Sequence, residues 1–213
     1  EVEVRGNTLV EGGGGQMSQG GGIYNTGKLR ITRSTISNNV ATRGGGISNT
    51  NQGHVQIQLS TISGNQAAGA GGGIRRVRAG VVVIGASTIS NNSANSPTGP
   101  GVVEPDPYGG GIYNSETARV YMANTILAGN KDQRSRYDAN YSPDCYSVTR
   151  GRFTSNRDNL IGILTDNCVI QDATSGDTSF EQFGTPVAPL DPRLDPLGYY
   201  GGTTATHRLR YDS

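Results

Sequence analysis

The stretch Gly20-Gly21-Gly22-Ile23-Tyr24-Asn25 recurs along the chain and decides its fold. Its first four residues return at Gly44, Gly71 and Gly109, so that successive copies begin 24, 27 and 38 residues apart. A second motif lies between the copies and reads Ser-Thr-Ile-Ser at 34–37, 60–63 and 87–90, and more loosely Asn-Thr-Ile-Leu at 124–127. Self-similarity at such a period is typical of solenoid proteins.

Between these motifs, apolar and polar residues alternate with a period of two, as in residues 29–32 (Leu-Arg-Ile-Thr) and 55–58 (Val-Gln-Ile-Gln). This period indicates β-strands, and no segment shows a sustained helical period. A repeat of about 25 residues cannot bury an apolar face alone, whereas coils stacked in register share one aliphatic interior. The sequence therefore predicts an all-β fold, a single-stranded parallel β-helix with about 24–27 residues per coil.

The apolar residues of the repeats stand at fixed offsets, which predicts that like residues stack along the interior. Four residues before each repeat threonine, counting Thr8 as a degenerate first copy, stand Val4, Ile31, Ile57, Ile84 and Tyr121. In three of the four Gly-Gly-Gly-Ile copies, an asparagine stands two residues after the isoleucine: Asn25, Asn49 and Asn114. We predict that these asparagines form a buried ladder of hydrogen-bonded side-chain amides, which Arg76 interrupts in the third copy.

The glycine triplets predict corners, because glycine permits positive φ and close backbone approach. A calcium-binding β-roll needs an aspartate in each glycine-rich turn. It is disfavoured here, since no Asp or Glu occurs between Gly12 and Val103. We expect coils over residues 1–144 with a Pro- and Gly-rich loop inserted at 93–108, followed by a C-terminal coil and an irregular capping region at 145–213.

The two motifs together resemble those of bacterial extracellular right-handed parallel β-helix proteins that carry Gly-Gly-Gly-Ile-Tyr-Asn and Ser-Thr-Ile-Ser-x-Asn repeats and are polymorphic-outer-membrane-protein-like. The resemblance covers nearly the whole chain, and the stretches 158–162 and 201–207 resemble the closing region of that group. It implies a right-handed solenoid at the surface of a bacterium or outside it, often anchored there. The group is defined by fold and location, so the resemblance implies no reaction.

Cys145 and Cys168 are the only cysteines and lie 23 residues apart, close to one coil length. We predict that they form a disulfide between adjacent coils; unpaired thiols would be the expectation in a cytosolic protein. One cysteine pair without a nearby His offers too few ligands for a metal site. No cofactor is predicted, although the Asp-rich C-terminal end leaves room for calcium.

The net charge of +1 hides an uneven distribution. Between residues 12 and 103 there are seven basic residues and no acidic one: Lys28, Arg30, Arg33, Arg43, Arg75, Arg76 and Arg78. This segment predicts affinity for an acidic polysaccharide or lipopolysaccharide, and a merely solvated surface is the alternative. Nucleic acid is not expected, because aromatic residues do not interleave with the basic ones.

Tyrosine and arginine side chains on one face can stack on sugar rings and pair with their acidic groups. The candidate residues for binding an anionic glycan are Tyr24, Arg30, Arg75, Arg76, Arg78 and Tyr113. A column of repeat threonines, with serines two residues on, would resemble the hydroxyl arrays of ice-binding solenoids. Strand propensity and cross-strand hydroxyl bonding account for it more simply.

No catalytic residues are predicted. Hydrolysis of a glycan needs two carboxylates, and the regular coils offer none. The acidic candidates lie in the loop and near the fourth coil: Glu104, Asp106, Glu116, Asp132, Asp138 and Asp144. A lyase would need a base such as Arg75, Arg76 or Arg78, but no spacing selects one. His54, expected in a turn, and His207 have no evident triad partner.

We therefore expect an extracellular structural or adhesive surface protein that binds anionic polysaccharide. The alternative is a polysaccharide lyase or glycoside hydrolase of the pectate-lyase-like type. The chain begins directly in a strand at Val2 and Val4. An open first coil is a template for another chain, so copies of the protein itself, end to end, or an upstream segment of a longer chain are expected partners. No stretch is apolar enough for a transmembrane helix.

Overall fold

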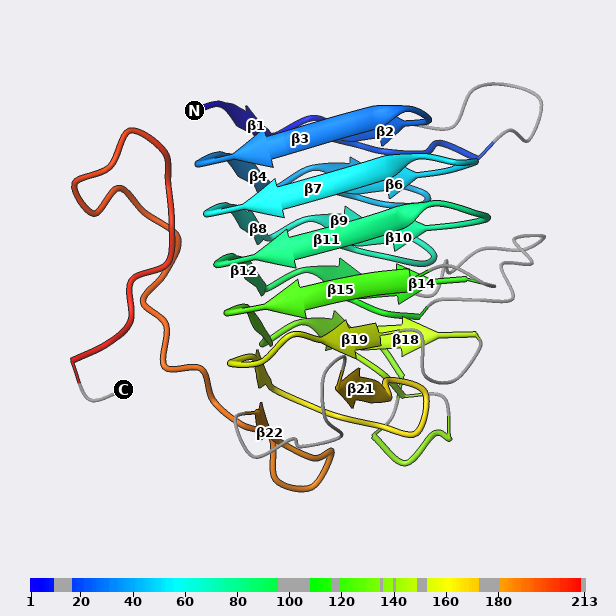
Figure 1. Ribbon diagram of the computed structural model, residues 1–213, viewed down its shortest axis with the longest axis vertical. Helices are drawn as coiled ribbons and strands as arrows, with labels where there is room; N and C mark the ends of the chain where they lie inside the picture. Colours follow the sequence, from blue (N-terminus) through cyan, green and yellow to red (C-terminus); the bar gives the residue numbers. More distant parts are fainter. Residues whose placement is uncertain are drawn as a thin grey trace.

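A computed structural model describes residues 1–9, 17–95, 108–115, 119–134, 136–139, 141–148, 153–172 and 181–211. These residues form a parallel β-helix whose four sheets run along its length (Figure 1). We number the sheets in the order in which a coil visits them. Every strand pair between neighbouring coils is parallel.

Sheet 1 holds the strands that follow the glycine triplets: β2 (Ile23–Asn25), β6 (Ile47–Asn49), β10 (Ile74–Arg76), β14 (Ile112–Asn114) and β18 (Cys145–Ser147). Sheet 2 holds the longest strands: β3 (Lys28–Thr32), β7 (His54–Gln58), β11 (Val81–Gly85), β15 (Arg119–Ala123), β19 (Phe153–Ser155) and β21 (Ile170–Asp172).

Sheet 3 is built mainly from the Thr-Ile-Ser strands: β1 (Glu3–Arg5), β4 (Thr35–Ser37), β8 (Thr61–Ser63), β12 (Thr88–Ser90), β16 (Ile126–Ala128), β20 (Leu160–Ile161) and β22 (Gln182–Phe183). Sheet 4 consists of two-residue strands: β5 (Val40–Ala41), β9 (Gln66–Ala67), β13 (Ser93–Ala94) and β17 (Lys131–Asp132).

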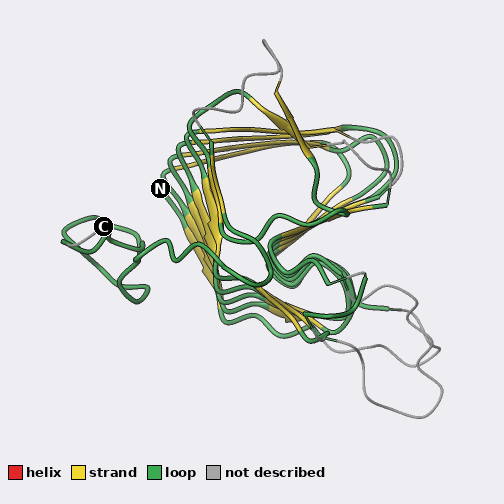
Figure 2. Cartoon of the chain, turned by 90° about the horizontal axis from the view of Figure 1, so that it is seen from below, coloured by secondary structure: helices red, strands yellow, loops and turns green. Residues whose placement is uncertain are grey.

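The winding is right-handed, because the nearest strands in Figure 1 run from right to left while the chain descends. Figure 2 shows how the coils superimpose when seen along the solenoid. Ile23 pairs with Ile47, and Ile47 with Ile74, which gives windings of 24 and 27 residues. The predicted fold and coil length are confirmed for these windings. The next winding is longer, because Ile74 pairs with Ile112.

The interior consists of columns of like residues. Ile31, Ile57 and Ile84 lie in register and are buried, as the fixed offsets predicted. The next position in this column is Met122 and not Tyr121, which faces outward. The prediction for Val4 was also wrong: it pairs with Ile36 in sheet 3. Apolar residues at positions 2 and 4 are compatible with a strand of sheet 2 or of sheet 3, so the sequence alone did not assign this strand to its sheet.

The glycine triplets are explained by three different constraints. The first glycine of each triplet has a positive φ, as at Gly71 (73°). A Cβ atom on the second, such as Gly72, would lie 2.3 Å from the Ser93 carbonyl oxygen of sheet 4. A Cβ on the third, Gly73, would lie 2.7 Å from the Gly111 carbonyl oxygen and 3.1 Å from the side chain of Asn92.

That asparagine belongs to a ladder that was not predicted from the sequence and that is buried from Asn39 onward. The side-chain amide N–H of each member donates to the Oδ1 atom of the next, at 2.9 Å in every step, along Asn7, Asn39, Asn65, Asn92, Asn130 and Asp144. The backbone N–H of Asn65 also donates to Asn92 Oδ1 (3.1 Å), and the Asn65 amide donates to the Ile36 carbonyl. These bonds satisfy polar groups inside the coil corner, which would otherwise destabilise it.

The predicted ladder at Asn25 and Asn49 also exists, with a hydrogen bond of 2.8 Å. Arg76 interrupts it as expected, since this residue pairs with Asn49 on one side and Asn114 on the other. The predicted disulfide between Cys145 and Cys168 is present, and both cysteines are buried.

The stacked sheets continue into the C-terminal part of the chain. Strands β18 to β22 extend the same sheets beyond residue 144, and β13 occupies the first two residues of the expected 93–108 loop. Residues 96–107 of that loop lie outside the described part of the chain. Residues 191–211, which we call the C-terminal strap, return along the side of the solenoid toward the first coil (Figure 1). They lie against sheet 3 and not across the end as a cap.

The third triplet glycine offers a direct test of the ladder packing. Gly73→Ala should lower the free energy of unfolding by about 2 kcal/mol, because the added methyl overlaps the Gly111 carbonyl and Asn92. Gly85→Ala is the matched control, since a Cβ there meets no atom within 4 Å. Chemical unfolding measures both, and equal stabilities would contradict the assigned role of Gly73.

Candidate functional site

A basic pocket lies on the outer face of sheet 1 and has a volume of about 250 Å³. Tyr24 of β2 and Arg75 of β10 stand on either side of Ser48 in the register of this sheet. Arg43 stands in the corner just before a glycine triplet and lines the pocket. Its backbone forms an isolated β-bridge with the backbone of Gln19. Arg78 follows β10 in a left-handed turn with φ of 69°. Three arginines thus line the same pocket as one tyrosine.

Polar contacts hold several of these side chains. Arg75 Nη1 donates to Gln19 Oε1 at 3.1 Å, and Thr50 Oγ1 donates to the Tyr24 hydroxyl at 3.2 Å. Tyr24 remains 53% exposed. Guanidinium groups bind carboxylate and sulfate oxygens in paired hydrogen bonds, and an exposed aromatic ring stacks on a sugar. The pocket therefore combines the groups that an acidic sugar requires.

The structure brings together three of the six expected binding residues, namely Tyr24, Arg75 and Arg78. Arg30 is exposed but lies on β3, in sheet 2. Arg76 and Tyr113 are buried, with 0% and 5% of their surfaces exposed, and so cannot meet a polymer from outside. The inward turn of Arg76 brings its Nη1 atom to the Arg78 carbonyl oxygen.

Arg43 was the residue that the analysis of the sequence missed as a binding candidate. It stands one position before a glycine triplet, as Gln19 does, so a column drawn at that offset would have identified it.

Tyr113 belongs instead to an aromatic stack in the lower part of sheet 1. Its ring lies parallel to that of Tyr146 at 5.8 Å, and Tyr146 stacks on Tyr108 at 4.2 Å. The guanidinium of Arg134 lies 3.4 Å from the centre of the Tyr108 ring. This cation–π contact and the ring stack stabilise the coils around the long winding.

The hydroxyl column of sheet 3 is covered by the C-terminal strap. Thr35 Oγ1 donates to the Ala205 carbonyl oxygen, and the hydroxyls of Thr61 and Thr206 lie 3.1 Å apart. Thr35 and Thr61 are consequently buried, so this part of the column is not an open hydroxyl array.

His207 is a buried residue of the strap and contacts a serine of sheet 3. Its Nε2 atom lies 2.8 Å from Ser63 Oγ, and its Nδ1 atom lies 2.8 Å from the Asp195 backbone carbonyl oxygen. The carbonyl oxygen can only accept, so Nδ1 donates to it, and Nε2 and the Ser63 hydroxyl share the second hydrogen bond. Ser63 is only 2% exposed, so in this arrangement the pair holds the strap and presents no nucleophile to solvent.

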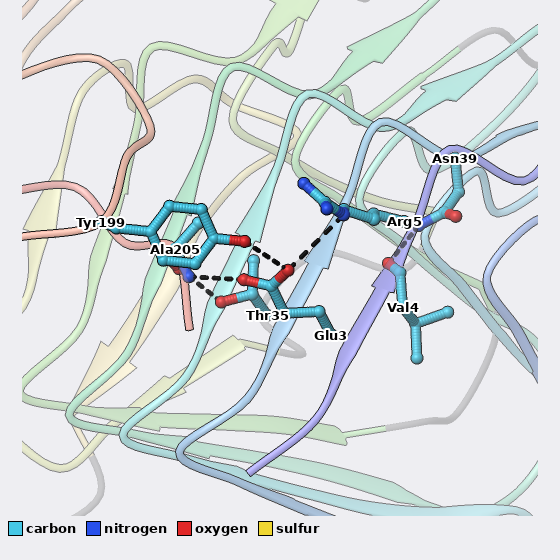
Figure 3. Close-up of polar contacts among 7 residues, drawn as sticks. All are labelled: Glu3, Val4, Arg5, Thr35, Asn39, Tyr199 and Ala205. Carbon is cyan, nitrogen blue, oxygen red and sulfur yellow. Dashed lines mark hydrogen bonds and ion pairs between the residues drawn. The ribbon is translucent and has the colours of Figure 1, made fainter. Parts of the chain in front are cut away.

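Glu3 fastens the same strap to the first coil (Figure 3). The Ala205 backbone N–H donates to Glu3 Oε1 at 2.7 Å, and the Tyr199 hydroxyl donates to Oε2 at 2.8 Å. The hydrogen bond from Ala205, followed by that from Tyr199, lowers the pKa of the Glu3 carboxyl. This contribution to stability is therefore present above the ordinary pKa of Glu and is lost as the pH falls through the lowered value.

Asp144 ends the asparagine ladder as a buried carboxyl group. Its Oδ1 accepts from the backbone and side-chain N–H groups of Asn130, and its Oδ2 accepts from the Ile163 N–H at 2.7 Å. Burial raises the pKa of Asp144 to about 7, although these three donors oppose the shift. Burial likewise raises the pKa of Asp132, which replaces the inward alanine of sheet 4.

The remaining acidic candidates do not assemble into a site in the described ranges. Asp138 is exposed, and Glu104, Asp106 and Glu116 lie outside the described residues. His54 is exposed at the start of β7 and not in a turn. Where the structure describes the chain, no three or more His, Cys, Asp or Glu side chains are arranged to hold a metal ion. The expectation that the protein has no cofactor, with room for calcium at the Asp-rich end, stays a prediction.

The parallel β-helix defines the class of the protein, and one family model matches part of it. The model of the Chlamydia polymorphic membrane protein (Chlamydia_PMP) repeat matches residues 86–115. This segment carries one Ser-Thr-Ile-Ser motif and one Gly-Gly-Gly-Ile-Tyr-Asn motif, so the chain is similar to that repeat over one winding. No curated protein and no solved structure matches the chain. Over the described ranges, no helix is of a length and hydrophobicity that would let it cross a membrane.

Asp144 predicts a pH dependence of stability with a definite sign. Its folded pKa of about 7 lies above the unfolded value of about 3.9, so the folded protein retains a proton that the unfolded chain loses. Its contribution to the free energy of unfolding should therefore fall as the pH rises from about 4 to 7.

Asp144→Asn should flatten this pH profile in chemical unfolding experiments. It should also destabilise the fold by about 2 kcal/mol. In either orientation of the new amide, its NH2 group would face an N–H group of Asn130 or Ile163 that now donates to the carboxylate. Asp158→Asn, at an exposed position, is the control and should keep the wild-type slope. An unchanged slope in Asp144→Asn would show that another group titrates.

The bond between Ser63 and His207 predicts how firmly the strap is held. Ser63→Ala removes a bond of about 1 kcal/mol and should raise the rate of trypsin cleavage after Arg208 about fivefold. Ser90→Ala changes the serine in register on the next coil and serves as the control. Equal cleavage rates in the two variants would rule out a role for this bond in holding the strap.

Proposed function

We propose that the protein is an adhesive surface protein that binds acidic polysaccharide through the basic pocket of sheet 1. The observation that carries the proposal is that Arg43, Arg75 and Arg78 line one pocket together with the exposed Tyr24. The similarity to a membrane protein repeat supports a location at the cell surface. The proposal requires only binding, which the pocket can provide without a catalytic carboxylate.

The shape of the solenoid supports an adhesive role for a polymer. Sheets extend along the whole axis, so a chain of sugars can run across several coils and contact more than one basic residue. Salt weakens such contacts because they are electrostatic.

We include as part of the proposal that the first coil can pair with another strand. Among the described residues, β1, β2 and β3 are end strands of their sheets, and a second copy or an upstream segment would satisfy these edges.

The test is binding to immobilised heparin and alginate, measured at several salt concentrations. The variant Arg43→Gln/Arg75→Gln/Arg78→Gln should bind about tenfold more weakly and with a smaller salt dependence. The control Arg30→Gln/Arg33→Gln removes two charges outside the pocket and should retain most of the affinity. Equal losses in both variants would show a diffuse charge effect and would contradict the pocket.

The same samples separate the adhesive proposal from the enzymatic alternative. A binding protein leaves the polysaccharides intact. New reducing ends or unsaturated uronates, detected by absorbance after long incubation, would contradict a purely adhesive role and would favour a lyase or hydrolase.

A further inference from the structure

A second hollow lies on another side of the solenoid, on the outer face of sheet 2, and has a volume of about 460 Å³. It is formed where the strands β7, β11, β15 and β19 reach the corner before sheet 3. A volume in this range is that of ordinary small-molecule sites. It shares no lining residue with the basic pocket.

The hollow exists because one column of outward-facing residues on sheet 2 contains side chains of very different length. Thr32 pairs with Gln58, Gln58 with Gly85, and Gly85 with Ala123. Gly85 and Ala123, on two successive coils, thus lack the long side chain that Gln58 carries on the preceding coil. A Cβ atom on Gly85 would meet no atom within 4 Å. Asn156 continues the column below, since its N–H donates to the Met122 carbonyl. At a strand spacing of about 4.8 Å, the three steps from Gln58 to Asn156 span roughly 14 Å.

The walls of the hollow are aromatic and apolar on one side. Val83 and Tyr121 face outward next to each other in the register of β11 and β15, and both are partly exposed. At the corner, Leu59 has a φ of 52° and is 54% exposed, so its side chain forms an apolar edge.

Apart from the Tyr121 hydroxyl, the polar side-chain groups of the hollow are amides. Gln58 lies at one end, and Asn124 and Asn156 lie at the other. Each amide offers two donors and one acceptor oxygen, which suits hydroxyl groups that also donate and accept. Among the residues that the structure describes, no Lys, Arg, His, Asp or Glu lines the hollow.

We propose that this hollow binds one or two rings of a neutral saccharide. The C–H face of a pyranose would lie against Tyr121 and Val83, and its hydroxyls would bond the amides at the two ends. The uncharged lining disfavours the acidic sugars that suit the basic pocket, because their carboxylates would lose hydration without gaining a counter-charge. The apolar side chain of a peptide could occupy the same space, and the experiment below distinguishes the two.

Gly85→Gln is the decisive variant, since it restores the long side chain of the repeat and fills the hollow. Gly27→Gln is the matched control: its Cβ also meets no atom within 4 Å, and it lies outside the hollow. Tyr121→Ala removes the aromatic wall. Thermal unfolding of each variant should match that of the wild type before binding is compared.

Titration with maltotriose, N,N′-diacetylchitobiose and lactose, followed by amide chemical shifts in NMR spectra, tests the proposal. At least one saccharide should shift the signals of Gly85 and Ala123 with a dissociation constant of about 1 mM or lower. Gly27→Gln should keep this affinity, whereas Gly85→Gln and Tyr121→Ala should lose it at least tenfold.

Three results would overturn the proposal. These are no shift at Gly85 and Ala123 with any of the three saccharides, an unchanged affinity in Gly85→Gln, or tighter binding of the peptide Leu-Ala-Leu with the same loss in Gly85→Gln. Heparin binding, measured on the same variants, should stay at the wild-type level. A failure of the neutral site is thus distinguishable from a failure of the basic pocket.

Discussion

The stacking of identical side chains at the coil corners is the constraint on which the rest of the structure depends. Each ladder asparagine bonds the next coil through both its side chain and its backbone N–H, so a shift of one residue would leave several buried polar groups unsatisfied. The third glycine of each triplet leaves the space that this ladder occupies. Aliphatic columns alone would tolerate slippage, whereas the amide bonds allow one register only.

The sequence allowed the fold to be predicted because its repeats impose the same residue types on every coil. Ile31, Ile57 and Ile84 could be placed inward from their spacing alone. The ladder at Asn39, Asn65 and Asn92 escaped notice although each follows its repeat threonine by four residues, because buried asparagine resembles ordinary turn asparagine in a sequence. The strap could not be predicted: it has no repeat, and its contacts join residues about 200 positions apart.

The candidate site was predictable only in part for a related reason. Alternation assigns a residue to the inside or the outside of a strand, but it does not say which sheet the strand joins. Arg30 and Arg75 are both outward residues, yet they lie on different sides of the solenoid. Arg76 was expected to interrupt the inward asparagine column and also to bind a glycan. It cannot do the second, because it alternates with Arg75 along β10 and is buried like Ile74. The sides of the solenoid formed by sheets 1, 2 and 3 consequently differ in chemistry. Arginines lie on sheet 1, an uncharged hollow lies on sheet 2, and the strap covers part of sheet 3.

The strap gives the molecule an unusual response to tension. Residues 203–207 are fastened beside the first three strands of sheet 3, β1, β4 and β8, although the chain reaches them only after the last coil. A load applied at the C-terminal end would first peel the strap from sheet 3 one contact at a time. The twenty-one residues released would extend by up to roughly 70 Å before any coil had to unwind. In a protein that holds two surfaces together, such a slack segment would absorb a sudden pull while the binding faces stayed intact.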